Sequence, residues 1–187
     1  SQFVLQVDGV GSFLVIPKQA VSMGPISSST RPDLGLLVNP NLPSVTIERE
    51  DEDYFLTSSE TISVDDAATT RKLLNDGDRI RLSEKCRIKF NLPNAASTTA
   101  TLVLSGARLP RPDINYVILM DRGILLGPGC NNHIRAGSLQ GTMALTLQRG
   151  RLICKSAQKQ LIDGQPIAAG TALPMNKPVK LDRLSLV

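Results

Sequence analysis

Residues 13–25, FLVIPKQAVSMGP, and residues 116–128, YVILMDRGILLGP, follow one pattern at a constant offset of 103 positions, with no gap. Each stretch begins with four apolar residues and ends in Gly-Pro. Two further blocks match in the same order, at offsets of 98 and 99: residues 62–66 with 160–164, and 78–82 with 177–181. Three matched blocks in one order predict a tandem duplication.

The apolar runs are short, rich in β-branched residues and separated by Gly- or Pro-containing turns, which predicts strands of a sandwich or barrel. The expected strands are 3–7, 13–16, 45–48, 54–56, 79–82, 87–90, 101–104, 116–119, 143–147, 152–154 and 179–181. No segment has helical spacing over the ~10–12 residues that a helix needs. Residues 66–74 leave room for one or two helical turns, which Thr69 and Thr70 disfavour.

A length of 187 residues fits one or two domains. The polar segment 92–98 begins with Leu-Pro and is the expected link between the repeats. We therefore expect an all-β chain of two separate β-sandwich domains, residues 1–93 and 94–187, with the boundary between about residues 91 and 99.

Composition disfavours several classes of function. No apolar run approaches the ~18 residues of a membrane span, and the first residues do not have the pattern of a signal peptide. Three scattered cysteines predict neither a disulfide nor a zinc site and suggest a reducing compartment, so we expect a cytoplasmic protein. His133 is the only histidine, aromatic residues make up 3% of the chain, and there is no Trp. Catalysis, a metal or other cofactor, and base stacking are all disfavoured.

Charge is divided unevenly along the chain. Residues 1–93 hold 10 Lys and Arg against 13 Asp and Glu, a net charge of −3, whereas residues 94–187 hold 11 against 4, a net +7. The basic second half is expected to attract phosphates, acidic peptides or the first half itself, although ordinary solubilising surface explains the same numbers.

The order of strands and turns resembles the forkhead-associated (FHA) domain, a phosphothreonine-reading β-sandwich of about 11 strands. The residues that carry the resemblance are Val21-Ser22-Met23-Gly24 at the Gly-Arg turn, residues 41–47 at the Ser-Arg-x-His segment, Val64-Asp65-Asp66 at the Val-Asn-Gly turn, Leu74 to Ile80 at the L-x-x-Gly-Asp-x-Ile stretch, and Phe90 in the final strand. The resemblance covers nearly the whole chain in two copies, a layout similar to bacterial, planctomycete-type proteins with two consecutive FHA-like units.

The chain departs from the family where the family binds phosphate. Pro25 and Pro128 replace the arginine after the turn glycine. In the first unit, the family's serine, following arginine, histidine and Asn-Gly turn are replaced by Asn41, Leu42, Ser44 and Asp65-Asp66. In the second unit, the same positions hold Ser138, Leu139, Gly141 and Asp163-Gly164. A phosphate dianion needs converging cations and N–H or O–H donors. We therefore expect no phosphothreonine site in the first unit and a very weak one in the second.

Other charged segments are candidate surfaces. Arg79, Arg81, Arg87 and Lys89 alternate with apolar residues, which predicts four cations on one outer face, either binding an anion or acidic peptide or guarding a sheet edge, with Asp76, Asp78 and Glu84 as neutralising groups. Arg149 and Arg151 flank a Gly150 hairpin turn, with Lys155 and Lys159 farther along. The acidic run 48–53 is expected to be a solvated hairpin tip, and His133 a solvated or capping residue.

The expected function is a non-catalytic protein-interaction and signalling module that lacks the usual phosphothreonine pocket and binds a protein, or packs on other domains of a longer chain. The alternative is a phosphopeptide reader that uses substituted residues in the second unit, namely Ser138, Arg135 and Arg149. Asn41 and Arg151 are further candidate ligand-binding residues. An enzyme ranks third. A nucleic-acid binder ranks fourth, because no groove-reading or stacking element accompanies the basic charge.

Overall fold

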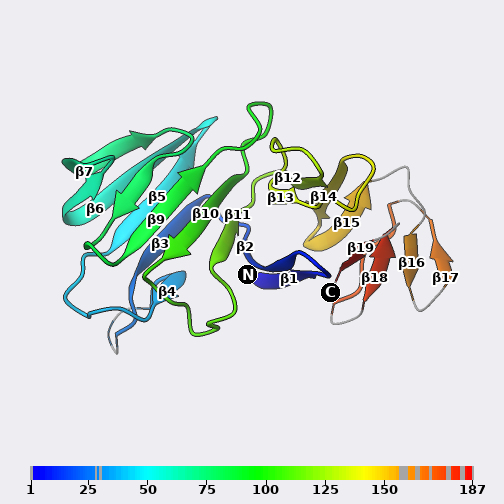
Figure 1. Cartoon of the computed structure of the whole chain (residues 1–187), viewed down its shortest axis with the longest axis horizontal. Helices are drawn as coiled ribbons and strands as arrows, with labels where there is room; N and C mark the ends of the chain where they lie inside the picture. The colour runs from blue at the N-terminus through cyan, green and yellow to red at the C-terminus, as the bar shows by residue number, and fades with distance from the viewer. Residues whose placement is uncertain are drawn as a thin grey trace.

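The computed structural model describes residues 2–27, 29, 31–155, 160–162, 165–168, 170–175, 178–181 and 184–186. Over these residues it is all-β with no helix, so none of them forms a helix that could cross a membrane (Figure 1). Every segment expected to be a strand overlaps one. The possible helical turns at 66–74 are instead strand β7, because Asp65 and Asp66 both have positive φ, 50° and 64°, and turn the chain back along the preceding strand.

The first half of the chain begins with β1 and continues to β9. Their bounds are β1 Phe3–Val7, β2 Gly11–Ile16, β3 Ala20–Pro25, β4 Leu34–Leu36, β5 Val45–Glu50, β6 Asp53–Val64, β7 Ala67–Leu74, β8 Arg79–Arg81 and β9 Arg87–Asn91. The acidic run forms the exposed tip of the β5–β6 hairpin, as expected, with Asp51 at a φ of 54°.

The second half supplies β10 to β19. Their bounds are β10 Ala100–Ser105, β11 Tyr116–Leu119, β12 Gly123–Gly127, β13 Ile134–Arg135, β14 Met143–Gln148, β15 Arg151–Lys155, β16 Gln160–Ile162, β17 Gln165–Ile167, β18 Val179–Leu181 and β19 Leu184–Leu186. Asp163, Gly164 and Lys177, which belong to the repeat blocks, lie outside the described residues.

The twelve-residue strand β6 joins the two layers around the first core. Its beginning pairs with β5 in the layer β4-β3-β5-β6, and its end pairs with β8 in the layer β6-β8-β9-β10-β11-β2. The register against β7 shifts between Thr57 and Ile62, where the strand passes from one layer to the other. Apolar residues from both layers, including Leu56 and Phe90, form this core between them.

The second core lies between a separate four-stranded sheet and three strands of the large sheet, β11, β2 and β1. The four-stranded sheet has the order β13-β12-β14-β15. The pairing repeats that of the first half: β3 is flanked by parallel β4 and antiparallel β5, and β12 by parallel β13 and antiparallel β14. The duplication seen in the sequence is therefore also present in the topology.

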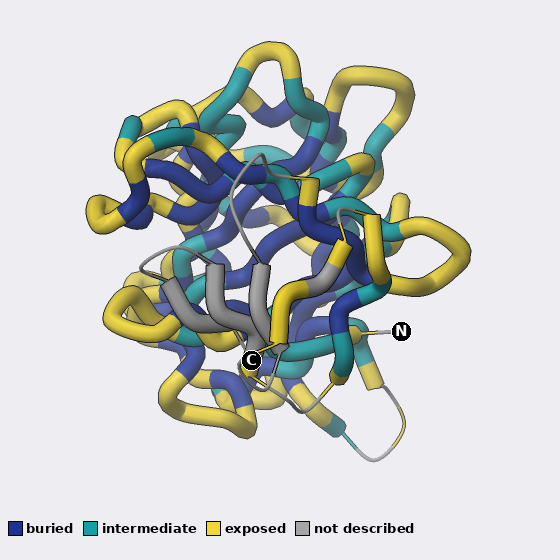
Figure 2. The backbone as a smooth tube through the Cα atoms, turned by 90° about the vertical axis from the view of Figure 1, so that its right-hand side faces the viewer, coloured by how far each residue is buried: buried dark blue, intermediate teal, exposed yellow. Residues whose placement is uncertain are grey.

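Strands β2 and β11 pair in parallel at the centre of the molecule and serve both cores. Val15 and Ile118 belong to the second core, whereas Ile16 and Leu119 belong to the first. A strand buried on both faces needs a continuous apolar run rather than alternation, which explains FLVI and YVIL. Figure 2 shows buried backbone running through the interior and exposed loops around it.

Each core is completed by a strand from the other half of the chain. Ala100, Leu102 and Leu104 of β10 lie in the first core, and β10 pairs with β9. Leu5 and Val7 of β1 lie in the second core, and β1 pairs with β19 at the other end of the chain. The two cores therefore do not follow the expected division at residues 93 and 94. Two separate sandwiches were expected, but one large sheet contains strands from both halves of the chain. The physical reason is that β1 and β10 have exchanged places between the repeats.

Candidate interaction surface

Four basic side chains share one face of neighbouring strands β8 and β9. Arg79 lies directly opposite Lys89, and Arg81 directly opposite Arg87. The alternate residues Ile80, Ile88 and Phe90 point into the first core. The expected common face is therefore confirmed by the register. Directly opposed residues have Cβ atoms ~4.5–5.5 Å apart, so these like charges repel one another unless an anion lies among them.

Carboxylates neutralise only half of this face. Asp65 and Asp66, on the β6–β7 turn, lie 3.8 Å and 3.6 Å from the guanidinium groups of Arg79 and Arg81, in exposed contacts that contribute little. Arg87 donates from Nε to the backbone carbonyl of Glu84, not to its carboxylate. Among the residues that the structure describes, neither Arg87 nor Lys89 has a carboxylate partner.

The acids expected to neutralise this face have other partners. Asp78 is buried, and its carboxylate accepts hydrogen bonds from Lys72 Nζ at 2.6 Å and from Asn75 N–H at 2.8 Å. Burial acts to raise the pKa of Asp78, but these donors outweigh it and hold the pKa below its usual value. Asp76 accepts a hydrogen bond from Leu92 N–H. Both acids hold the Gly77 turn together rather than the cationic face.

The second-unit candidates do not form one site. Arg135 is exposed on β13 and donates from Nε to the Pro128 carbonyl at 3.2 Å, and Ser138 is exposed in the loop that leads to the start of β14. Arg149 and Arg151 lie beyond the far end of β14, at the hairpin where Arg149 and Gly150 have φ of 52° and 74°. Six strand residues span ~20 Å, too far for one phosphate to reach both ends. Lys159 lies outside the described residues.

None of the first-unit residues aligned with the family's phosphate site carries a positive charge. Gly24 abuts Ser44, since a Cβ on Gly24 would lie 2.7 Å from Ser44 Oγ. Pro25 is buried at the end of β3. Asn41 is exposed in the β4–β5 loop, where its N–H donates to Asn39 Oδ1 at 3.0 Å. Gly24 and Ser44 are therefore in contact, and neither of them carries a charge.

His133 is buried, contrary to the expectation of a solvated or capping residue. It is 1% exposed, and its Nδ1 accepts a hydrogen bond from Leu125 N–H at 2.8 Å. Burial lowers the pKa of His133 to about 4, so the ring is neutral near pH 7. The physical reason is that β11 and β12 both contact this residue: Leu125 of β12 donates to its ring, and Tyr116 Oη of β11 donates to its carbonyl.

The three cysteines form no disulfide with one another. Cys86 and Cys154 are buried in the first and second core, and burial raises the pKa of each thiol to about 11. Cys130 is exposed. The two buried thiols are therefore protonated and packed as small apolar groups.

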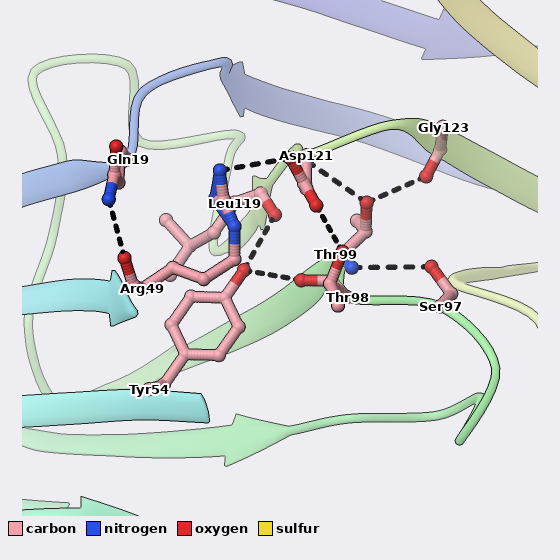
Figure 3. A network of polar contacts seen from close by, with 9 residues as sticks. All are labelled: Gln19, Arg49, Tyr54, Ser97, Thr98, Thr99, Leu119, Asp121 and Gly123. Atoms are coloured by element: carbon pink, nitrogen blue, oxygen red, sulfur yellow. Dashed lines mark hydrogen bonds and ion pairs between the residues drawn. The ribbon is translucent and has the colours of Figure 1, made fainter. Parts of the chain in front are cut away.

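A polar network that the sequence analysis missed joins the two halves (Figure 3). Arg49 of β5 and Asp121 of the β11–β12 turn form an ion pair at 2.9 Å, with Thr98 Oγ1 donating to the same carboxylate. Tyr54 Oη donates to the Thr98 carbonyl at 2.6 Å, and Thr99 Oγ1 to the Gly123 carbonyl at 2.7 Å. The only signal in the sequence was the opposite net charge of the halves.

A cavity of about 540 Å³ opens beside this network, between the β5–β6 hairpin and the β11–β12 turn. Its charged lining residues are Asp51, Glu52, Asp121 and Arg122. Both signs of charge are present, and Asp121 is already paired with Arg49. Among the described residues, no group of three or more His, Cys, Asp and Glu side chains could hold a metal ion.

Comparison with known proteins found no match of any kind: no family model, no curated protein and no solved structure is significantly similar to this chain.

Proposed function

We propose that this chain is a non-catalytic protein-interaction module made of two FHA-like β-sandwich units that recognises its partner without a phosphothreonine pocket. The repeated topology supports the two-unit description: in both halves a strand ending in Gly or Gly-Pro is flanked by a parallel strand and an antiparallel hairpin.

The packing of the most reactive side chains carries the non-catalytic part of the proposal. His133 is neutral, buried and already accepts a backbone hydrogen bond, and Cys86 and Cys154 are protonated in the cores. A general base must reach a substrate proton, and a thiol nucleophile must ionise. These three residues are placed for packing, whereas the charged residues of the loops and of the β8–β9 face are open to a partner.

The absence of a cation at the aligned first-unit positions supports recognition without phosphothreonine. Pro25 offers neither a positive charge nor an N–H, and Leu42 offers no charge. Asp65 and Asp66 stand at the family's Asn-Gly turn and would repel a phosphate. Charge-assisted contacts are the strong ones in phosphate recognition, so little discrimination remains without them.

A paired peptide array tests this function. The full chain is incubated with threonine-containing peptides, each present as a phosphorylated and an unphosphorylated copy, and the affinities of the peptides it retains are measured by fluorescence anisotropy. We expect retained peptides whose two copies bind within about threefold of each other. Binding of the phosphorylated copies alone, abolished by Arg135→Ala with Ser138→Ala, would establish the phosphopeptide alternative instead. Retention of no peptide in either form would overturn the function itself.

A further inference from the structure

We infer that the face formed by Arg79, Arg81, Arg87 and Lys89 binds an extended acidic segment of a partner protein, with the segment lying along strands β8 and β9. This inference rests on the proposed function and names the chemistry of the partner.

The spacing of the cations matches an extended peptide. In each strand the two cations are two residues apart, which is ~6.7 Å at 3.3–3.4 Å per residue. Alternate residues of an extended chain have the same spacing and point to the same side. Carboxylates at every second position of the segment would therefore meet both cations of one strand. The two cations of the other strand lie one strand spacing away.

The charge of the face is open to such a partner. Arg87 and Lys89 have no carboxylate partner among the described residues, and Asp65 and Asp66 reach the other two cations only at 3.6 Å or more. The register continues the face onto polar positions at both sides: Ser63 of β6 lies opposite Arg81, and Ser105 of β10 lies opposite Arg87. Ser105 is exposed, so a segment lying there meets hydroxyl groups at its margin.

The same surroundings disfavour nucleic acid. Single-stranded nucleic acid gains its affinity from bases stacked on aromatic rings as well as from phosphate contacts. The neighbours of the four cations in the register are Ser63, Val103 and Ser105, and none is aromatic. The carboxylates of Asp65 and Asp66 also lie at one border of the face, where a continuous phosphate backbone would meet them.

The binding test uses the full chain and a fluorescein-labelled ten-residue peptide of alternating Glu and Ser. The comparison peptide has the same composition in the order SEESSEESSE, in which no two glutamates are two residues apart, so that it cannot place carboxylates on both cations of one strand. We expect the alternating peptide to bind more tightly and to weaken as salt increases. Tighter binding of the comparison peptide would contradict the geometry, and so would tighter binding of a duplex DNA that carries the same number of charges.

Two charge-reversal pairs locate the site. Arg87→Glu with Lys89→Glu should weaken the alternating peptide by at least about tenfold, because two attractions become repulsions. The matched control, Arg149→Glu with Arg151→Glu, makes the same change in net charge on the exposed β14–β15 hairpin and should weaken it by less than about threefold. Equal losses in the two pairs, or a larger loss in the control, would overturn the inference.

Thermal melting of both variants checks the fold, and Arg87→Gln with Lys89→Gln replaces the reversal pair if the glutamates destabilise the sheet. Sedimentation of the chain without peptide tests whether a second copy occupies the face instead. A concentration-dependent dimer that the Arg87 and Lys89 changes abolish would mean that the acidic β5–β6 hairpin of a second copy binds there. That result would overturn the inference. If array peptides bind but the Arg87 and Lys89 changes leave their affinities unaltered, only this inference fails, whereas an array that retains nothing removes the proposed function as well.

Discussion

Val15 and Ile16 are neighbours in β2, and each is completely buried in a different hydrophobic core. Ile118 and Leu119 repeat this arrangement in β11, the parallel partner of β2. Successive side chains of a strand point to opposite faces, so this central pair lines both cores at once. Loss of either core exposes one face of both strands, which couples the stability of the two halves.

Separate halves should therefore fail to fold. A polypeptide of residues 1–93 lacks Ala100, Leu102 and Leu104 of the first core, and one of residues 94–187 lacks Leu5 and Val7 of the second. We expect collapsed amide spectra for each fragment in ¹H–¹⁵N NMR, and the dispersed spectrum of the full chain when the two are refolded together. A dispersed spectrum from both fragments alone would contradict the strand exchange.

The Arg49–Asp121 ion pair should contribute measurably to stability. Their side chains are only 17% and 20% exposed, so water screens the pair less than it screens a surface pair. A double-mutant cycle with Arg49→Gln and Asp121→Asn, followed by urea unfolding, should give a coupling energy of about 1–2 kcal/mol.

The matched control for this cycle is Arg111–Asp113, an ion pair at 2.8 Å whose side chains are 50% and 53% exposed. Its coupling energy should be much smaller than that of Arg49 with Asp121, because water screens the two exposed side chains. A control coupling as large as that of Arg49 with Asp121 would mean that the network does not tie the halves together.

Acid should destabilise the chain through His133. Its pKa is about 4 in the folded chain and near its ordinary 6.5 when unfolded, so between these values only the unfolded state takes up the proton. The contribution is present above pH 6.5 and is lost as the pH falls from 6.5 to 4, by a total on the order of 3 kcal/mol. Urea unfolding at several pH values measures this loss.

His133→Asn is the control, because the Asn side chain keeps an acceptor near the position of Nδ1 and does not titrate. The variant should show a smaller fall in unfolding free energy across this pH window, whatever its stability at pH 7. An unchanged pH dependence would mean that protonation of His133 does not cause the loss.

Gly106→Ala should be among the most disruptive glycine substitutions. Gly106 has a φ of 69°, and a Cβ there would lie 1.6 Å from the Lys85 carbonyl oxygen. Backbone movement is unavoidable, and we expect a loss above about 3 kcal/mol in thermal or urea unfolding. Gly150→Ala, with a φ of 74° and no atom within 4 Å of the added Cβ, should cost only about 1 kcal/mol. Equal losses at the two positions would contradict the packing around Lys85.

Local patterns predicted local structure well. The alternation of Arg79, Ile80 and Arg81 predicted which side chains face outward, and the Arg149-Gly150 turn and the acidic hairpin tip are where the sequence indicated. Short elements bounded by turn residues depend mainly on near neighbours, which a single sequence displays. Strand β7 was harder to predict, because its residues have few apolar neighbours in the sequence and they form a strand by pairing with β6.

The candidate site was predictable only where its members share a hairpin. Arg135 and Arg149 are both basic and exposed, but β14 separates them, and the sequence carries no sign of that distance. His133 sits beside polar residues in the chain, so its burial depends on β11 and β12, which pack against it in space.

Periodicity and residue type along the chain were enough to predict an all-β chain, two repeating halves and four cations on one sheet face. The exchange of β1 and β10, the two cores shared by β2 and β11, and the contact of Arg49 with Asp121 became visible only in the folded chain. In equivalent repeats, β1 and β10 each suit either core by hydrophobicity, and the choice depends on long-range pairing and burial that no local pattern encodes.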